Sequence, residues 1–320
     1  MKKLLIFAIV LALMLPGCGQ QDRYSVTYLD LFDTVTTITG YGPRFQTQAD
    51  DIYEKLLRYH QLFDIYHDYE GLNNLKTIND QAGIAPVVVE ADIIALLQDC
   101  KAYFDLTGGR VNVAMGSVLR LWHEARQSGA LPAQDALSEA ARHRDWAQVI
   151  IDEAASTVYI ADEALSLDVG AIAKGWACQR VASQAAEGLL ISLGGNVCAT
   201  GPKDEKGTPW RIGVQDPAGG AEYLRTLSLT HGSVVTSGDY QRTVTIDGVA
   251  YHHIIDPDTL MPAAYWRSVT VVCPDSGLAD ALSTALFLLP LEEGKALAES
   301  CGAQALWVDE KGEQFSSLRE

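Results

Sequence analysis

The sequence has 320 residues, and 24 Lys and Arg stand against 41 Asp and Glu, which gives a formal net charge of −17. A surface this acidic repels phosphate backbones, so the composition argues against a nucleic-acid-binding protein. Apart from Cys18 the cysteines are scattered and form no C-x-x-C pair, which predicts core thiols rather than a disulfide framework or a zinc site.

The first 17 residues have the pattern of an export signal. Lys2 and Lys3 precede an apolar run, residues 4–15, that is too short to span a bilayer as a finished helix. The run ends in Leu-Pro-Gly-Cys, which resembles the site cut by the bacterial lipoprotein signal peptidase, so Cys18 would become the acylated N-terminus. The alternative is an ordinary secretory signal in which Cys18 is incidental.

Acylation at Cys18 would decide where the protein works. Each buried acyl CH₂ contributes about 0.8 kcal/mol, and more than one chain gives stable anchoring without a membrane-spanning helix. We therefore expect a bacterial membrane-anchored lipoprotein that faces outside the cytoplasm. Residues 1–17 would be the signal peptide, 18–24 a tether and 25–320 the folded region.

The N-terminal half of the folded region predicts a hairpin followed by helices. Residues 25–41 alternate in the manner of a β-hairpin, with inward positions expected at Val26, Tyr28, Val35 and Ile38. Apolar residues then recur at helical spacing, which predicts helices over 46–66, 91–104 and 117–126.

The C-terminal half is richer in strands. Strands are expected over 149–152, 157–160, 189–193, 210–214, 224–229, 243–246 and 268–272. Helices are expected over 171–186, 278–289 and 291–301. The mixture predicts an α+β fold that forms one large unit or two tightly joined lobes.

The segment from Leu167 to Gly175 ends a β-like run and opens a helix with small residues in its first turn. Such a turn leaves backbone N–H groups free to face an anion, and Lys174 would add positive charge one turn into the helix. A pyrophosphate would fit there. A close-packed strand-to-helix turn without a ligand explains the same residues equally well.

Asp280 and Thr284 are four residues apart on an otherwise apolar helix, so their oxygen atoms share one face. Hard oxygen donors suit Mg²⁺, which usually takes one or two carboxylates and completes its octahedron with water and phosphate oxygens. The competing interpretation is a helix N-cap at Asp280 with a solvent-facing Thr284.

Two further motifs place polar groups at the ends of strands. His253 alternates with apolar neighbours and precedes an Asp-Pro turn, a placement that could present its imidazole to a cleft, although a lone histidine in a strand is more often structural. Leu193-Gly194-Gly195-Asn196 ends a strand in two glycines, where a ligand or another backbone could approach closely.

Together these motifs, in this order and spacing, resemble the ApbE-type FAD:protein FMN transferases from about Phe32 to Phe287. The matching stretches are 32–34, 63–66, 107–109, 167–175, 193–196, 209–213 with 216–217, 237–240, 253–257 and 279–287. The chain departs from the family where Ala-Phe-Asp is common and it has Arg110-Val111-Asn112, and where Thr-Gly-x-Pro is common and it has Thr259-Leu260-Met261-Pro262.

The resemblance implies a set of site residues. Mg²⁺ would be held by the Asp280 carboxylate, the Thr284 hydroxyl and the Ala171 carbonyl. Residues 25–320 would then form the catalytic domain, with His253 near the reacting phosphate as the candidate base. The FAD donor would contact Phe32, Tyr66, Arg110, Val111, Asn112, Asp168 and Lys174.

The implied reaction is transfer of FMN from FAD to a Thr or Ser hydroxyl of a partner flavoprotein, with release of AMP. In the family the acceptors are flavin-carrying subunits of membrane electron-transfer complexes, and an anchor at Cys18 would place the enzyme beside them. Two alternatives stay open: a pyrophosphatase that splits FAD into FMN and AMP, and a lipoprotein that binds flavin without chemistry.

Overall fold

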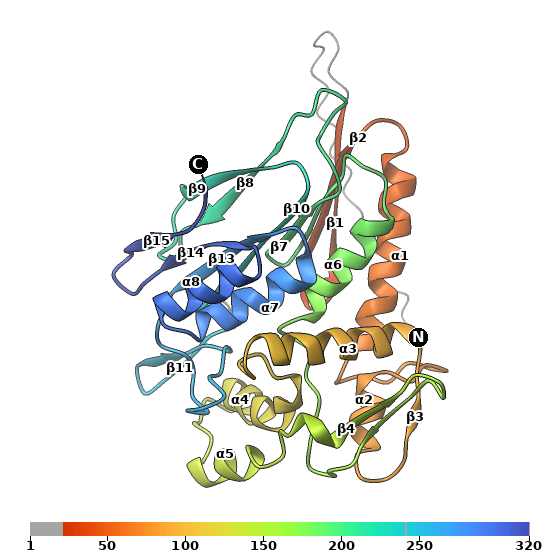
Figure 1. Cartoon of the computed structure of the whole chain (residues 1–320), viewed down its shortest axis with the longest axis vertical. Helices are drawn as coiled ribbons and strands as arrows, with labels where there is room; N and C mark the ends of the chain where they lie inside the picture. Colours follow the sequence, from red (N-terminus) through yellow and green to blue (C-terminus); the bar gives the residue numbers. More distant parts are fainter. Residues whose placement is uncertain (1–21, 241, 320) are drawn as a thin grey trace.

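An antiparallel sheet of eight strands forms the upper part of the protein as drawn in Figure 1. The structure is a computed structural model and describes residues 22–240 and 242–319. In spatial order the strands are β1 (Arg23–Leu31), β2 (Thr34–Tyr41), β6 (Leu190–Leu193), β7 (Asn196–Ala199), β10 (Gly232–Gly238), β13 (Ser268–Cys273), β14 (Gln304–Val308) and β15 (Gln314–Ser316).

The predicted N-terminal hairpin is confirmed, with one inward position wrong. Val26 pairs with Ile38 between β1 and β2, and both side chains are buried. Val35, expected to point inward, is 54% exposed, whereas its neighbour Thr36 is fully buried. Because side chains alternate along a strand, the buried Thr36 and Ile38 send Val35 to the other face. β1 begins at Arg23, earlier than the expected end of the tether.

Two helices in front of the sheet carry the residues of most interest. They are α6 (Ala173–Gln184) and α7 (Ser276–Phe287), which pack on each other and on strands β7, β10 and β13. Helix α1 (Phe45–Phe63) packs beside α6, and α8 (Leu291–Ser300) follows α7. These helices confirm the apolar periodicity read from the sequence, with boundaries shifted by a few residues.

A second group of elements lies at the other end of the molecule (Figure 1). It contains the helices α2 (Leu75–Asp80), α3 (Ala91–Leu106), α4 (Gly116–Ser128) and α5 (Gln134–Ala140), the short 3₁₀ helices η1 (Val113–Met115) and η2 (Trp146–Gln148), and a small sheet. The sheet has the strand order β3 (Val87–Val88), β5 (Thr157–Ile160), β4 (Val149–Asp152).

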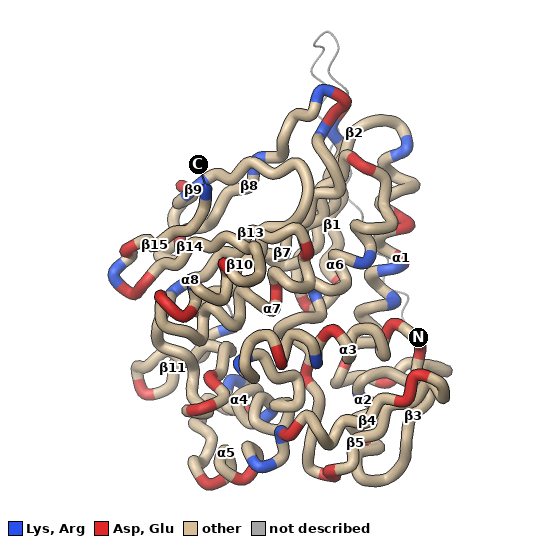
Figure 2. Tube along the Cα trace, viewed as in Figure 1, with Lys and Arg blue, Asp and Glu red and all other residues tan. Residues whose placement is uncertain are grey.

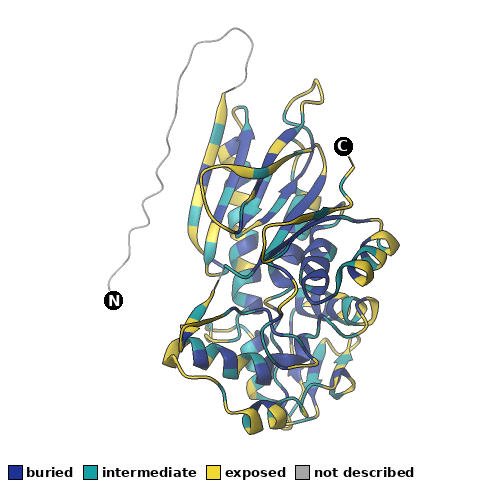
Figure 3. Cartoon of the chain, turned by 90° about the vertical axis from the view of Figure 1, so that its left-hand side faces the viewer, coloured by how far each residue is buried: buried dark blue, intermediate teal, exposed yellow. Residues whose placement is uncertain are grey.

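Two hairpins complete the chain. They are β8 (Trp210–Gln215) with β9 (Tyr223–Leu229), and β11 (Val244–Ile246) with β12 (Val249–Tyr251). The largest buried apolar cluster runs from Val26 in the first hairpin through α1, α3 and α6 to Ala285 in α7. Figure 3 shows buried residues concentrated between the sheet and the helices. The expected α+β class is confirmed.

The distribution of charge agrees with the acidic composition, because Asp and Glu residues occur along the chain at both ends of the molecule (Figure 2). The five described cysteines are free thiols, and all but Cys301 are buried, as expected for core residues. Among the described helices, none combines the length and the apolar character needed to cross a membrane. The predicted signal peptide and Cys18 lie outside the described residues.

Candidate active site

A cavity of about 1100 Å³ lies where the two groups of elements meet. Its walls come from the β1–β2 turn, the end of α1, the segment before α4, the start of α6, strand β10 and helix α7. The site residues expected from the sequence that line this cavity are Phe32, Tyr66, Arg110, Val111, Asn112, Asp168, Ala171, Lys174, His253, Asp280 and Thr284. The fold thus gathers segments that are more than 200 residues apart.

Asp280 is joined to the first turn of α6 by a hydrogen bond. The Gly175 N–H donates to Asp280 Oδ2 at 2.8 Å. In a regular helix that amide would donate to the carbonyl four residues earlier, which belongs to Ala171. Within the described part of the chain no hydrogen bond from Gly175 to that carbonyl is formed. The Ala171 oxygen therefore lacks its usual helical donor, and Ala171 lines the same cavity as Asp280.

The environment of the Asp280 carboxylate favours a cation. The side chain is 4% exposed, and no ion pair to it occurs among the described residues. Burial raises the pKa of Asp280, while the charge of Lys174 and the Gly175 amide act in the opposite direction. A buried carboxylate without a paired charge is costly, and a bound metal ion would compensate it.

Helix α7 is capped by a different residue. Asp275 is its N-cap, and its Oδ1 accepts a hydrogen bond from the Leu278 N–H at 2.8 Å. The interpretation of Asp280 as an N-cap is therefore wrong, since Asp280 lies one turn inside the helix. Thr284 follows one turn later and also lines the cavity. Among the described residues no group of three or more His, Cys, Asp or Glu side chains is arranged to hold a metal ion.

The turn before α6 offers fewer free amides than the sequence predicts. The Gly170 N–H donates to Asp168 Oδ1 at 2.8 Å, and the amides of Ile172 and Ala173 both donate to the Val169 carbonyl. These N–H groups donate to acceptors within the turn and are not directed at a ligand. Positive charge at this wall comes instead from the ammonium of Lys174, the next residue along the chain, which also lines the cavity.

Phe32 and Tyr66 both contribute aromatic surface to the lining of the cavity. Phe32 has a φ of 52°, and its N–H donates to His60 Nδ1 at 3.1 Å. A left-handed backbone is uncommon for an aromatic residue and often marks a functional site. Tyr66 is 52% exposed and stacks on His123, with ring centroids 5.3 Å apart.

The backbone that presents Tyr66 is fixed by Asp64. Its Oδ1 accepts the Tyr66 N–H at 2.6 Å, and its Oδ2 accepts the Tyr69 hydroxyl at 2.8 Å. Burial alone would raise the pKa of Asp64, but these hydrogen bonds and those from His67 outweigh it and lower the pKa. Asp64 therefore stays ionised and holds the turn.

Two arginines in the cavity are absent from the expected site. Arg126 on α4 and Arg242 both line it, and neither forms an ion pair within the described residues. Burial and the like charge of Arg242 lower the pKa of Arg126, whereas Tyr66 and Asp168 act in the opposite direction. Arg126 stands seven residues after Leu119 and three after His123, which also line the cavity. That helical spacing is the signal that could have identified it.

The adjacent histidines have different environments. His252 is buried, its Nε2 donates to the Ala263 carbonyl at 2.8 Å, and its Nδ1 accepts the Ile254 N–H at 3.2 Å. His253 lines the cavity instead. It lies in a bend just after β12, so its expected position within a strand is wrong. The reversal of side-chain direction between neighbours still places one histidine in the core and one in the cavity.

The Arg110-Val111-Asn112 segment is held largely by internal contacts. Val111 is 2% exposed. The Asn112 side chain accepts the Ala114 N–H and donates to the Arg144 carbonyl at 3.0 Å. The guanidinium of Arg110 lies 2.5 Å from Asp258 Oδ2. All three residues border the cavity, and two of them have polar groups engaged elsewhere.

The chain is similar in sequence and in fold to known proteins. The model of the ApbE family matches residues 32–307. A protein of Treponema pallidum described as FAD:protein FMN transferase is 39% identical over 253 residues, which cover 73% of this chain and 70% of the relative. A protein of Klebsiella pneumoniae with the same description is 36% identical over 250 residues, covering 75% and 77%. The crystal structure of the ApbE protein of Thermotoga maritima superposes with a TM-score of 0.84 at 31% identity, covering 92% of this chain and 97% of that chain.

Proposed function

Since the chain belongs to the ApbE family, we propose that it is an Mg²⁺-dependent FAD:protein FMN transferase, which moves FMN from FAD to a Thr or Ser hydroxyl of a partner flavoprotein. The observation that carries this proposal is the single cavity of about 1100 Å³ lined by every described residue that the chemistry needs. It combines aromatic walls, a buried carboxylate, four cationic side chains and His253.

The metal would be held by the Asp280 carboxylate, the Thr284 hydroxyl and the Ala171 carbonyl. The buried, unpaired carboxylate and the released carbonyl in the same cavity support this set. Bound there, Mg²⁺ would supply neutralisation of the charge that develops on the pyrophosphate. The chain's own contribution is the ammonium of Lys174, which adds positive charge at the same wall.

In the proposed reaction the acceptor hydroxyl oxygen attacks the FMN-side phosphorus of FAD. A new P–O bond forms to the acceptor, the bond to the AMP phosphate breaks, and the hydroxyl proton must be removed. His253 is the candidate base because the family resemblance assigns it a place near the reacting phosphate and it lines the cavity, while His252 is engaged in the core. Positioning of the hydroxyl by His253 would matter as well, since phosphoryl transfer has a loose transition state.

The decisive experiment incubates the purified protein with FAD, Mg²⁺ and a candidate acceptor domain from a membrane electron-transfer complex, and measures the acceptor's mass. Transfer predicts a gain of one FMN on a Thr or Ser side chain together with free AMP. FMN and AMP without an acceptor adduct would identify an FAD pyrophosphatase. Bound FAD that survives long incubation with Mg²⁺ would identify a flavin-binding protein without this chemistry.

We also propose that the protein is a lipoprotein anchored at Cys18 on the extracytoplasmic side of the membrane. The support is the basic start, the short apolar run and the Leu-Pro-Gly-Cys sequence. The variant Cys18→Ser should remain unacylated and either keep its signal segment or leave the membrane. Equal incorporation of labelled palmitate into wild type and variant would refute the assignment.

A further inference from the structure

The loop that carries His253, residues 252–263, is closed on itself. The Asp256 N–H donates to the Met261 carbonyl and the Leu260 N–H donates to the Asp256 carbonyl, both at 2.8 Å. These bonds fix the shape of the loop, which we call the His253 loop. Its attachment to the rest of the protein therefore determines where the imidazole lies relative to the cavity.

One attachment of the His253 loop is a buried contact with helix α4. The Trp122 indole N–H, on helix α4, donates to the Leu260 carbonyl at 2.9 Å, and the Trp122 ring stacks on Tyr251 with centroids 5.7 Å apart. Ile255 and Leu260 belong to the same buried cluster as Trp122. This contact fixes one side of the loop on α4.

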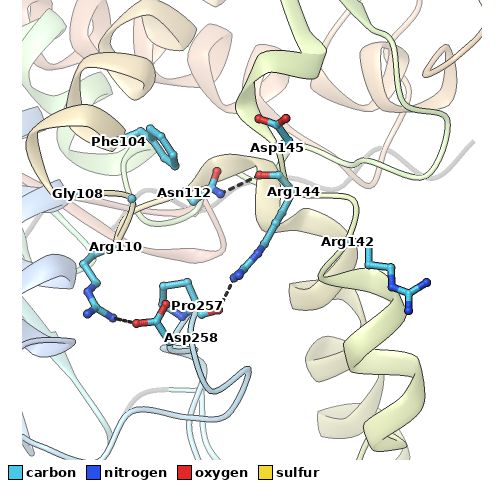
Figure 4. A pocket seen from close by; sticks show the side chains of 10 residues that line it. Phe104, Gly108, Arg110, Asn112, Arg142, Arg144, Asp145, Pro257 and Asp258 are labelled. Atoms are coloured by element: carbon cyan, nitrogen blue, oxygen red, sulfur yellow. Dashed lines mark hydrogen bonds and ion pairs between the residues drawn. The ribbon is translucent and has the colours of Figure 1, made fainter.

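The other attachment is polar and involves two arginines (Figure 4). Arg110 Nη1 lies 2.5 Å from Asp258 Oδ2 and 3.8 Å from Asp256 Oδ1, and Arg144 donates from Nη1 to the Pro257 carbonyl. Both side chains point at the same turn, whereas the Arg142 side chain points away from it. The turn at residues 256–258 is thus held by contacts that are separate from the contact of Trp122 with Leu260.

The residues that make these polar contacts border two cavities. A second cavity of about 390 Å³ shares Arg110 and Asn112 with the larger one and is also lined by Pro257 and Asp258. Asn112 links the two arginine segments, because its amide donates to the Arg144 carbonyl at 3.0 Å.

We propose that the Arg110–Asp258 ion pair is a latch that positions the His253 loop, so that Arg110 acts on transfer through the placement of His253. This inference rests on the proposed function for its effect on rate but not for its effect on the loop. The side chains of Arg110 and Asp258 are 29% and 66% exposed, so the pair is weak. We expect its removal to lower the transfer rate about two- to fivefold.

The test compares Arg110→Ala, Asp258→Ala and the charge-swapped double variant Arg110→Asp with Asp258→Arg. Hydrogen exchange of the Asp256 and Leu260 amides reports on the loop without any need for activity. We expect faster exchange in both single variants and recovery in the swap. In transfer assays kcat should fall while the KM for FAD stays constant, and Arg110→Ala should have no further effect when His253 is already Ala.

Arg142→Ala is the matched control, since Arg142 lines the second cavity but its ion pair among the described residues is with Glu139 on the surface. It should change neither exchange nor rate. If Arg110→Ala raises the KM for FAD and leaves loop exchange unchanged, Arg110 is a flavin contact and the latch is wrong. If the wild type transfers no FMN but exchange behaves as expected, the latch stands and the proposed function fails. Asp258→Asn replaces any single variant that does not fold.

Discussion

Gly175 on helix α6 and Asp280 on helix α7 are in direct contact where the two helices pack together. The Gly175 amide donates to Asp280 Oδ2 at 2.8 Å. A Cβ atom on Gly175 would clash with the Ser276 carbonyl oxygen and with the Asp280 side chain. The absence of a side chain at residue 175 therefore allows the hydrogen bond that orients the carboxylate and leaves the Ala171 carbonyl without its helical donor.

We predict that Gly175→Ala separates the two helices and disturbs the metal site. Overpacking of this kind costs about 1–3 kcal/mol, which denaturant unfolding will detect. Mg²⁺ affinity, measured by calorimetry, should fall in the same variant. The control is Gly294→Ala on helix α8, where a new Cβ would make an ordinary contact at 3.5 Å to Trp307. Equal effects of the two substitutions would contradict this explanation.

Asp280→Asn should separate stability from function. The amide keeps the volume of the carboxylate but removes a buried charge whose pKa is raised by desolvation. We therefore expect unfolding of the metal-free variant to require at least as much free energy as that of the wild type. Stabilisation by added Mg²⁺ and FMN transfer should both be lost, since one hard anionic ligand is removed. Normal transfer by the folded variant at limiting Mg²⁺ would refute the metal assignment.

Local patterns predicted much of the fold because many elements have a clear apolar period. Strands β4 and β5 begin and end where the sequence places them. Strand β10, at the centre of the large sheet, was missed because Gly232 and Gly238 flank it and only two of its residues are aliphatic. Its conformation depends on pairing with β7 and β13, which are remote in sequence.

The site residues carried by motifs were predicted, whereas those brought in by packing were not. Asp280, Thr284 and His253 stand in recognisable local sequences and line the cavity. The spacing of Arg126 from Leu119 and His123 puts the three residues on one face of α4, but only the packing of α4 shows that this face borders the cavity. The pairing of Arg110 with Asp258 joins residues 148 positions apart, which no local pattern encodes.

Arg126→Gln should weaken FAD binding without lowering stability. Arg126 is a partly buried cation without a carboxylate partner among the described residues, so it offers a charged donor to an anionic ligand. Hydrogen bonds to charged groups contribute about 1.5–3 kcal/mol, which corresponds to a loss of affinity of about tenfold or more. A titration that follows flavin fluorescence measures the affinity of the variant for FAD. Arg120→Gln, an exposed position on the same helix, is the control, and equal losses would show a general charge effect.

His253→Ala should lose far more rate than FAD affinity. General acid–base groups typically supply about 10²- to 10⁴-fold, and a group that acts on the acceptor's proton contributes chiefly in the transition state. His252→Ala is the matched comparison, because its imidazole bonds to the Ala263 carbonyl and the Ile254 amide in the core. The His252→Ala substitution should lower the melting temperature. Unchanged single-turnover transfer by His253→Ala, together with a lowered melting temperature, would remove His253 from the mechanism.

The protonation of His252 should make the His253 loop sensitive to acid. Burial lowers the pKa of His252, although the Ala263 carbonyl and Asp239 oppose this shift. Its Nδ1 accepts the Ile254 N–H, which a protonated ring cannot do. Since the folded-state pKa lies below the unfolded value of about 6.5, the unfolded chain binds the proton more readily. The stability that neutral His252 contributes is therefore fully present above about pH 6.5. It is lost as the pH falls from there through the lower pKa of the folded state.

His143 acts in the opposite sense, so only a comparison of variants isolates His252. The hydrogen bond that the His143 imidazole donates to the Asp162 carboxylate raises the pKa of His143. The stabilising contribution of His143 is therefore present at low pH and is lost as the pH rises through this raised pKa. We predict that the melting temperature of His252→Gln falls less than that of the wild type between about pH 8 and about pH 5, because Gln does not titrate. Parallel curves for the two proteins would show that His252 is not the acid-sensitive group.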